Sequence, residues 1–293
     1  MKKVLLASTV LALSATVAAA EVTVSGNARM GIVYDGNTTG ANTSKAQFTS
    51  RVRVVFSMSG ETDGGLSFGA SVRNDQSGQG NTANGDSTVF ISGAFGKLTF
   101  GDNDSAANVL VGNVAATSLT GLGDNNELGY LGQTDTSVLY EYSTGPISFA
   151  ASLGQLGTTA TATDNEDAMS VAVKYSADTF YVAVGYESAK VGVAATKDNQ
   201  TSVALGASFS GVDLKLVAAD RKSWTKTHYA ISGTYSMDGL GVTAFYASKE
   251  GVNNKAYGIG ASYDLGGGAT VVGGIQKVKG MSAMADVGLS FSF

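Results

Sequence analysis

The last nine residues of the chain, ADVGLSFSF, alternate strictly between apolar and polar side chains. Successive side chains of a β-strand point to opposite faces, so this segment predicts a strand with one apolar and one polar face. The same alternation recurs in EVTVSGNARMGIVYDGN, in AQFTSRVRVVFSMSG and in LSFGASVRND. These segments have 9 to 17 residues, and a β-strand needs about ten to cross a membrane.

Sixteen such strands can be placed between Glu21 and Phe293, and the links between them alternate between tight and long. The tight links are Gly60–Gly64, Ala94–Gly96, Thr144–Pro146, Ser176–Asp178, Ser210–Gly211, Met237–Gly239 and Gly266–Gly268. The longest intervening links are Asp35–Ala46, Asn74–Gly85, Asn103–Asp135, Gln155–Glu166 and Ser188–Asn199. This pattern predicts an all-β fold, a 16-stranded antiparallel transmembrane β-barrel with short periplasmic turns and longer external loops. The segment Val89–Asp102 alternates poorly, so the limits of its two strands are undefined.

The composition of the polar faces favours a barrel over a β-sandwich. A sandwich commonly exposes Lys and Glu on its solvent face. The polar positions here are mostly Gly, Ser, Thr and Asn with occasional Arg, which is typical of a water-filled lumen. The apolar face of the closing strand is then expected to face lipid.

The N-terminus predicts export. Two lysines precede an apolar stretch from Val4 to Val17, and Ala18-Ala19-Ala20 follows. This is the layout of a signal peptide, so we expect residues 1–20 to be cleaved and residues 21–293 to form the barrel domain. The net charge of −5 becomes −7 without Lys2 and Lys3, which argues against a nucleic-acid partner. The chain has no cysteine, which excludes disulfides and thiol nucleophiles.

Four segments resemble the general porins of the alphaproteobacterial, Rhodobacter type: TSRVRVVFSMSGETDGGLSFGASVRND, TVFISGAFGKLTFGD, AYGIGASYDLGGGATVVGGI and the closing ADVGLSFSF. The resemblance implies a homotrimer in the cell outer membrane of a Gram-negative bacterium, surrounded by outer-membrane lipid. It implies passive diffusion of ions and small hydrophilic solutes through each barrel. It also implies that the third external loop folds inward and narrows the channel, and that Phe293 serves as the membrane-insertion signal.

The third long link, Asn103–Asp135, is the candidate for that loop. It is acidic, and no Lys or Arg occurs from Leu98 through Val173. Its apolar run NVLVGNV can pack against a barrel wall, which favours function over disorder. The acidic side of a constriction would then comprise Asp102, Asp104, Asp124, Glu127 and Asp135. The alternative is a solvated acidic surface loop.

Four arginines form the candidate basic side of the constriction: Arg29, Arg51, Arg53 and Arg73. All four lie on the polar faces of the first three strands, which are neighbours in the predicted sheet. Opposed to an acidic loop, they would create a transverse field in the channel. The net charge and the acidic loop together predict mild cation selectivity.

The sequence offers few residues for catalysis, phosphate binding or metal binding. His228 is the only histidine, so a Ser-His-Asp triad could be built only around it, and we expect it to be solvent-exposed. Gly266–Gly268 is expected to be a tight turn rather than a phosphate loop. Asp164, Glu166 and Asp167 are weak candidates for a structural Ca²⁺, and we otherwise expect no metal, no cofactor and no catalytic residue. The two alternatives are an outer-membrane barrel enzyme and an exported β-rich adhesin.

Overall fold

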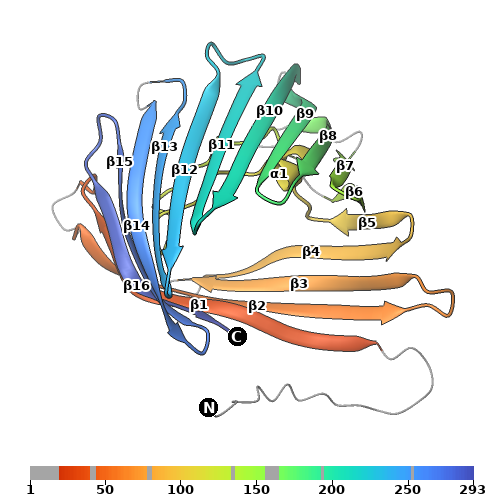
Figure 1. The fold of residues 1–293 in the computed structure, drawn as a ribbon, viewed down its shortest axis with the longest axis horizontal. Helices are drawn as coiled ribbons and strands as arrows, with labels where there is room; N and C mark the ends of the chain where they lie inside the picture. The colour runs from red at the N-terminus through yellow and green to blue at the C-terminus, as the bar shows by residue number, and fades with distance from the viewer. Residues whose placement is uncertain are drawn as a thin grey trace.

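A computed structural model describes residues 20–39, 44–77, 81–132, 136–155, 165–192, 195–251 and 254–293. Sixteen antiparallel strands close into one barrel in these ranges (Figure 1). The strands are β1 Glu21–Asp35, β2 Ala46–Glu61, β3 Ser67–Ser77, β4 Asn81–Gly93, β5 Gly96–Gly101, β6 Ser137–Thr144, β7 Ile147–Leu153, β8 Glu166–Ser176, β9 Phe180–Val191, β10 Thr196–Phe209, β11 Val212–Arg221, β12 His228–Met237, β13 Leu240–Ser248, β14 Lys255–Gly266, β15 Ala269–Val278 and β16 Met284–Ser292. One short helix, α1 (Ala106–Leu110), lies between β5 and β6. No helix within the described ranges is long and apolar enough to span a bilayer.

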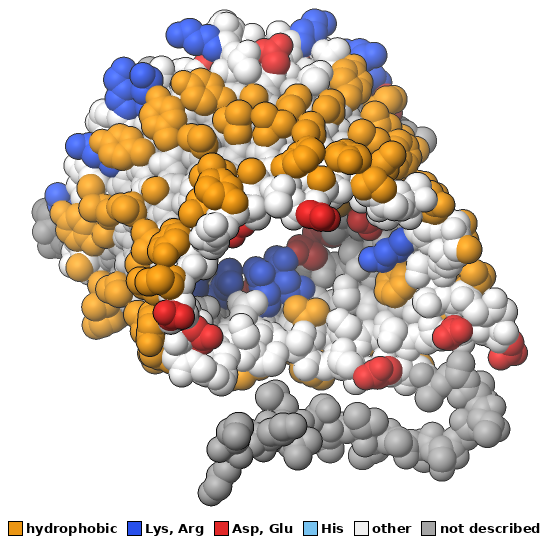
Figure 2. Space-filling view, in the orientation of Figure 1, with side chains coloured by type: hydrophobic (Ala, Val, Ile, Leu, Met, Phe, Trp, Pro, Cys, Tyr) orange, Lys and Arg blue, Asp and Glu red, His pale blue; other side chains and the backbone are white. Residues whose placement is uncertain are grey.

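The exterior of the barrel is apolar, as the alternation predicts. Large hydrophobic side chains of one parity are exposed along the strands, including Met30, Val52 and Val287. Figure 2 shows hydrophobic side chains as a broad band across the face of the barrel in view. In a closed barrel every strand has two neighbours, so the backbone is fully paired and only side chains face the lipid.

Closure of the barrel accounts for the apolar C-terminal strand. β16 pairs with β1 from Asn27↔Ser292 to Asp35↔Met284. Beyond the strand, the N–H of Phe293 donates to the carbonyl of Gly26 at 3.0 Å, and the N–H of Gly26 donates in return at 3.3 Å. The face that carries Val287 therefore lies on the outside of the closed sheet.

The short links are turns of two to five residues, as predicted. Gly266, Gly267 and Gly268 all have positive φ, at 81°, 64° and 86°, which confirms a tight turn between β14 and β15. Glycine adopts this left-handed conformation without the steric cost that a Cβ imposes.

The prediction of a long loop at Asn74–Gly85 is wrong. β3 continues to Ser77, β4 starts at Asn81, and Asn74 pairs with Asn84 across the two strands. Strands β9 and β10 likewise extend into the expected loop Ser188–Asn199. Polar residues favour loops in isolation, but pairing with a neighbouring strand overrides this weak preference at the ends of these strands.

Candidate functional site: a loop inside the lumen

The link from β5 to β6 enters the barrel and begins with α1 (Figure 1). Ser105 caps the helix by accepting a hydrogen bond from the N–H of Asn108 at 3.2 Å. The N–H groups of Ala106 and Ala107 donate to the hydroxyls of Ser152 on β7 and Ser170 on β8, both at 2.9 Å. The barrel wall thus satisfies backbone donors that the start of a helix leaves unpaired.

Beyond α1 the loop crosses the inner wall to the opposite side of the barrel. The N–H of Ala115 donates to the hydroxyl of Ser232 on β12 at 3.1 Å. At the far end, the carboxylate of Asp286 on β16 accepts bonds from the N–H groups of Leu119 at 3.0 Å and Thr120 at 2.7 Å. The Thr120 hydroxyl donates to the same carboxylate at 2.6 Å. We call residues 118–121 the loop tip.

The loop then returns along the same wall. The side-chain amide of Gln276 on β15 donates to the carbonyl of Gly121 at 3.0 Å, and that of Gln200 on β10 donates to Gly129 at 3.0 Å. The N–H of Leu131 donates to the carboxylate of Glu187 on β9 at 3.2 Å. Both limbs are therefore bonded to the wall, and the prediction that the third loop folds inward is confirmed.

Packing reinforces these bonds. Val111, Val114 and Leu128 of the loop are buried against small and apolar residues of the wall, among them Ala204 and Val217. The prediction that NVLVGNV packs on the barrel is confirmed.

Wall glycines allow the backbones to approach closely. A Cβ at Gly260 or Gly274 would overlap the carbonyl oxygen of Thr117, so only glycine fits beneath the loop there.

The four predicted arginines project from β1 to β3 into the lumen, across from the limbs of the loop. Arg29 lies directly opposite Arg51 in the register. Arg29 donates to the carbonyl of Leu119 in the loop tip at 3.1 Å, and Arg51 donates to the Asn27 side chain at 3.0 Å. The charge of Arg51 is repelled by the other three guanidinium groups, so the cluster creates a positive potential on this wall.

Two carboxylates that the sequence analysis did not select belong to this wall. Asp75 on β3 accepts two bonds from Arg53, both at 2.7 Å, and lies 3.3 Å from Arg73. Asp86 on β4 forms an ion pair with Arg73. The partners of Arg53 and Arg73 are thus on neighbouring strands, whereas Arg29 contacts the loop. Asp75 lies two residues after Arg73 on the same strand and therefore points into the lumen as well. This alternation could have identified Asp75 as a lumen residue from the sequence.

The predicted acidic residues occupy different places along the loop. Asp102 and Asp104 both precede α1 and are exposed, and Asp104 accepts a bond from the Asn108 side-chain amide at 2.8 Å. Asp124 and Glu127 are exposed on the returning limb. Asp135 lies outside the described residues. Figure 2 shows basic and acidic side chains together inside the opening of the barrel.

Electrostatic interactions connect the acidic loop to its surroundings. The carboxylate of Asp124 attracts the guanidinium of Arg29, as does that of Asp286. Although Glu127 is exposed to the lumen, the surrounding protein removes part of the water around its carboxylate and so raises its pKa, and the negative charge of Asp124 raises this pKa further. Lys249 directly follows β13. Burial lowers the pKa of its ammonium group, and the negative charge of Glu127 acts in the opposite direction. On the returning limb, Asp124 therefore interacts with Arg29 of the basic wall, and Glu127 interacts with Lys249.

The expectation that His228 is solvent-exposed is wrong. Its ring is 5% exposed and stacks on Trp224, with ring centroids 3.5 Å apart. Its Nε2 accepts a bond from the N–H of Glu250 at 2.9 Å. Glu250 in turn accepts bonds from the N–H and hydroxyl of Thr225, which lowers its pKa. His228 thus links two external loops at the rim of the barrel, where indole stacking excludes water from it.

The calcium candidates do not form a recognisable site. Asp167 makes an ion pair with Lys190 at 2.6 Å. Asp164 and the side chain of Glu166 lie outside what the structure describes. In the described part of the chain, no three His, Cys, Asp or Glu residues are grouped so that they could hold a metal ion.

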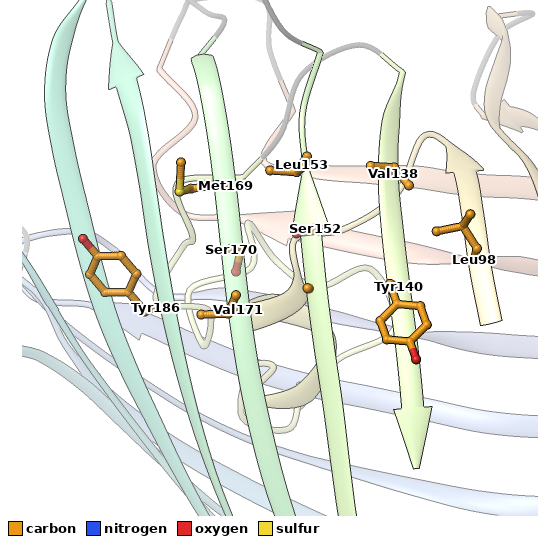
Figure 3. Close-up of a pocket in the computed structure, with 10 residues that line it drawn as sticks. Leu98, Val138, Tyr140, Ser152, Leu153, Met169, Ser170, Val171 and Tyr186 are labelled. Carbon is orange, nitrogen blue, oxygen red and sulfur yellow. The ribbon is translucent and has the colours of Figure 1, made fainter. Parts of the chain in front are cut away.

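A depression of about 390 Å³ lies on the outer wall over β5 to β9 (Figure 3). Its lining is almost entirely apolar and includes the large side chains of Tyr140 and Tyr186. Ala151 is small where its neighbours are bulky, and this leaves space on the wall. Apart from Ser152 and Ser170, whose hydroxyls bond the internal loop, the side chains that line the depression share the outward parity, so the depression faces the lipid.

A closed barrel with an apolar exterior and a charged lumen, narrowed by its own loop, is a transmembrane pore. The chain matches the model of the Gram-negative porin family over residues 7–281. It is 33% identical to the porin of Rhodobacter capsulatus, covering 93% of this chain and 100% of that protein. The chain belongs to the Gram-negative porin family, which confirms the resemblance seen in the sequence and fits an outer-membrane location.

Solved structures give the same assignment. A porin refined at 1.8 Å resolution is 32% identical, with a TM-score of 0.77 and coverage of 93% of this chain and 100% of that one. A mutant of the Rh. blastica porin has a TM-score of 0.78 over the same shares at 21% identity, and this likeness concerns the fold alone.

Proposed function

We propose that the barrel is a water-filled channel for passive diffusion of ions and small hydrophilic solutes. The observation that carries this proposal is the loop bonded along the inner wall from β7 to β16, with its tip against Arg29. A loop held at so many points narrows the lumen without closing it. A soluble adhesin or a barrel enzyme has no need of such a fixed internal constriction.

The mechanism follows from the placement of charge. Arginines line one wall, while Asp124 and Glu127 line the returning limb of the loop. Opposite charges across a narrow channel with low-dielectric walls create a transverse field, with potentials of several kT. Polar solutes align with this field as they pass, whereas apolar solutes must displace oriented water without compensation.

Mild cation selectivity is part of this proposal, because the acids of the loop are exposed while Arg53 is neutralised by Asp75. Reversal potentials in planar bilayers at low salt test it. Replacing Arg51 and Arg53 with Gln shifts the potential further toward cations, and replacing Asp124 and Glu127 with Asn and Gln shifts it toward anions. Unchanged potentials in both variants would show that these residues do not line the conducting path.

We also propose that the mature chain starts at Glu21 and assembles as a homotrimer. Export explains the basic and apolar N-terminal segment, and the family resemblance suggests the trimer. N-terminal sequencing of envelope-derived protein tests the first statement. Native gel electrophoresis with crosslinking tests the second, and a monomer at all concentrations would contradict it.

A further inference from the structure

Three lysines gather on the outward face of the barrel at the external ends of β14 and β15: Lys255, Lys277 and Lys279. Lys255 opens β14 on the side of the long links, away from the tight turn at Gly266–Gly268. The N–H of Lys279 donates to the carbonyl of Lys255 at 2.8 Å, so these two residues lie opposite each other. Lys277 lies two residues before Lys279 and pairs with Tyr257. We call the three residues the lysine triad.

The triad is a cluster of like charges. Residues directly opposite on antiparallel strands have Cβ atoms about 5 Å apart, and like charges in that arrangement are destabilising. All three side chains are exposed. In the part of the chain that the structure describes, none of the three forms an ion pair, so no carboxylate within these ranges balances the cluster.

Directly below the triad, the same face turns apolar. Tyr257, Ile259 and Ile275 are each about half exposed on the outer wall. Tyr229 and Tyr246 continue the row of tyrosines on β12 and β13, with ring centroids 6.2 Å apart. Tyrosine marks the level of lipid headgroups in membrane proteins, and the bulky aliphatic residues beneath face the acyl chains. Figure 2 shows basic side chains bordering the apolar band in this way.

We propose that the lysine triad binds the phosphate of an outer-leaflet lipid, whose acyl chains lie against the apolar wall below. A lipid phosphate at this level neutralises the clustered ammonium groups, and its chains add apolar contact that a dissolved anion cannot supply. The proposal rests on the placement of the barrel in the outer membrane. It does not depend on conduction, because the triad faces away from the lumen.

The test uses detergent-solubilised full-length mature protein and phosphatidic acid, with binding followed by native mass spectrometry. The variant Lys255→Gln/Lys277→Gln/Lys279→Gln is expected to bind phosphatidic acid at least about tenfold more weakly. Phosphatidylcholine binding is expected to stay unchanged, because the choline group balances its phosphate. Single-channel conductance of the variant, measured in parallel, shows that the barrel is folded and separates this test from that of the channel function.

The matched control is Lys197→Gln/Lys222→Gln/Lys226→Gln, which removes the same charge from exposed positions at the same end of the barrel. It is expected to bind phosphatidic acid as the unmodified protein does. An equal loss in both triple variants would overturn the proposal in favour of general surface charge. Displacement of phosphatidic acid by excess inorganic phosphate would overturn it in favour of a site for soluble anions.

Discussion

At the scale of single residues, parity along each strand decides whether a side chain meets lipid or water. On β2, Phe56 is exposed on the outer wall, whereas its neighbour Ser57 faces the lumen between Thr23 and Ser71. The two positions lie at nearly the same depth. They therefore provide a direct comparison of the two faces.

Phe56→Arg is expected to impair folding into bilayers, because an arginine on the lipid face is destabilising, by up to about 2–4 kcal/mol at the bilayer midplane. Ser57→Arg is expected to fold nearly as well as the unmodified protein, because the lumen hydrates the added charge. Urea unfolding of the two variants in lipid vesicles measures the difference. Equal losses of stability would mean that the assignment of the two faces is wrong.

A second residue-scale prediction concerns the pH dependence of selectivity. Partial desolvation and the charge of Asp124 raise the pKa of Glu127. As pH falls, Glu127 loses its charge before a carboxyl group of ordinary pKa does. The cation preference in bilayers is expected to decline from a pH above the usual range for glutamate. Glu127→Gln is expected to remove this early part of the decline while the later part remains.

At the scale of elements, the loop is positioned by residues of distant strands. Asp286 accepts three bonds from the loop tip, and bonds to a charged acceptor contribute about 1.5–3 kcal/mol each. Asp286→Ala is expected to release the tip, so the open channel becomes noisier and its mean conductance rises. Single-channel recordings measure both quantities.

Asp213→Ala provides the control for that experiment. Asp213 lies on β11 just after the turn that follows β10, and it accepts a bond from Ser208 at 2.5 Å, away from the loop. Its replacement removes the same charge and is expected to leave the channel noise unchanged. If both variants conduct alike, the bonds to Asp286 do not set the aperture.

These elements also show what sequence can predict. Alternation with period two identifies the strands, and parity places the arginines in the lumen, because both are local properties. The pairing of Arg53 with Asp75 depends on the register between β2 and β3, which a single strand does not reveal. The anchoring of the loop tip by Asp286 joins residues more than 160 positions apart, and no local pattern indicates it.

The glycines of β14 and β15 illustrate the same limit. Their parity correctly assigns Gly260 to the lumen face, where glycine is also typical of a water-filled channel. Its role beneath Thr117 is visible only once the path of the loop is known. The error at Asn74–Gly85 has the opposite cause, since local polarity predicted a loop where pairing between strands prevails.

At the scale of the whole molecule, the last residue extends the pairing of β16 with β1 that closes the barrel. Phe293 exchanges two main-chain hydrogen bonds with Gly26, while its side chain is 77% exposed. The backbone thus completes the sheet, and the ring makes little contact with the rest of the chain. The proposed role of the ring as an insertion signal can therefore be separated from the closure of the barrel.

Phe293→Ala keeps both main-chain bonds and removes only the exposed ring. Purified variant protein is expected to refold into lipid vesicles at the same rate and yield as the unmodified protein. In Gram-negative cells, the amount of folded barrel in the outer membrane is expected to fall several-fold, because the assembly machinery no longer recognises the C-terminus. Heat-modifiable mobility on gels measures folded protein in both settings. A loss of refolding in vesicles would instead assign the ring a structural role, and normal assembly in cells would exclude its role as a signal.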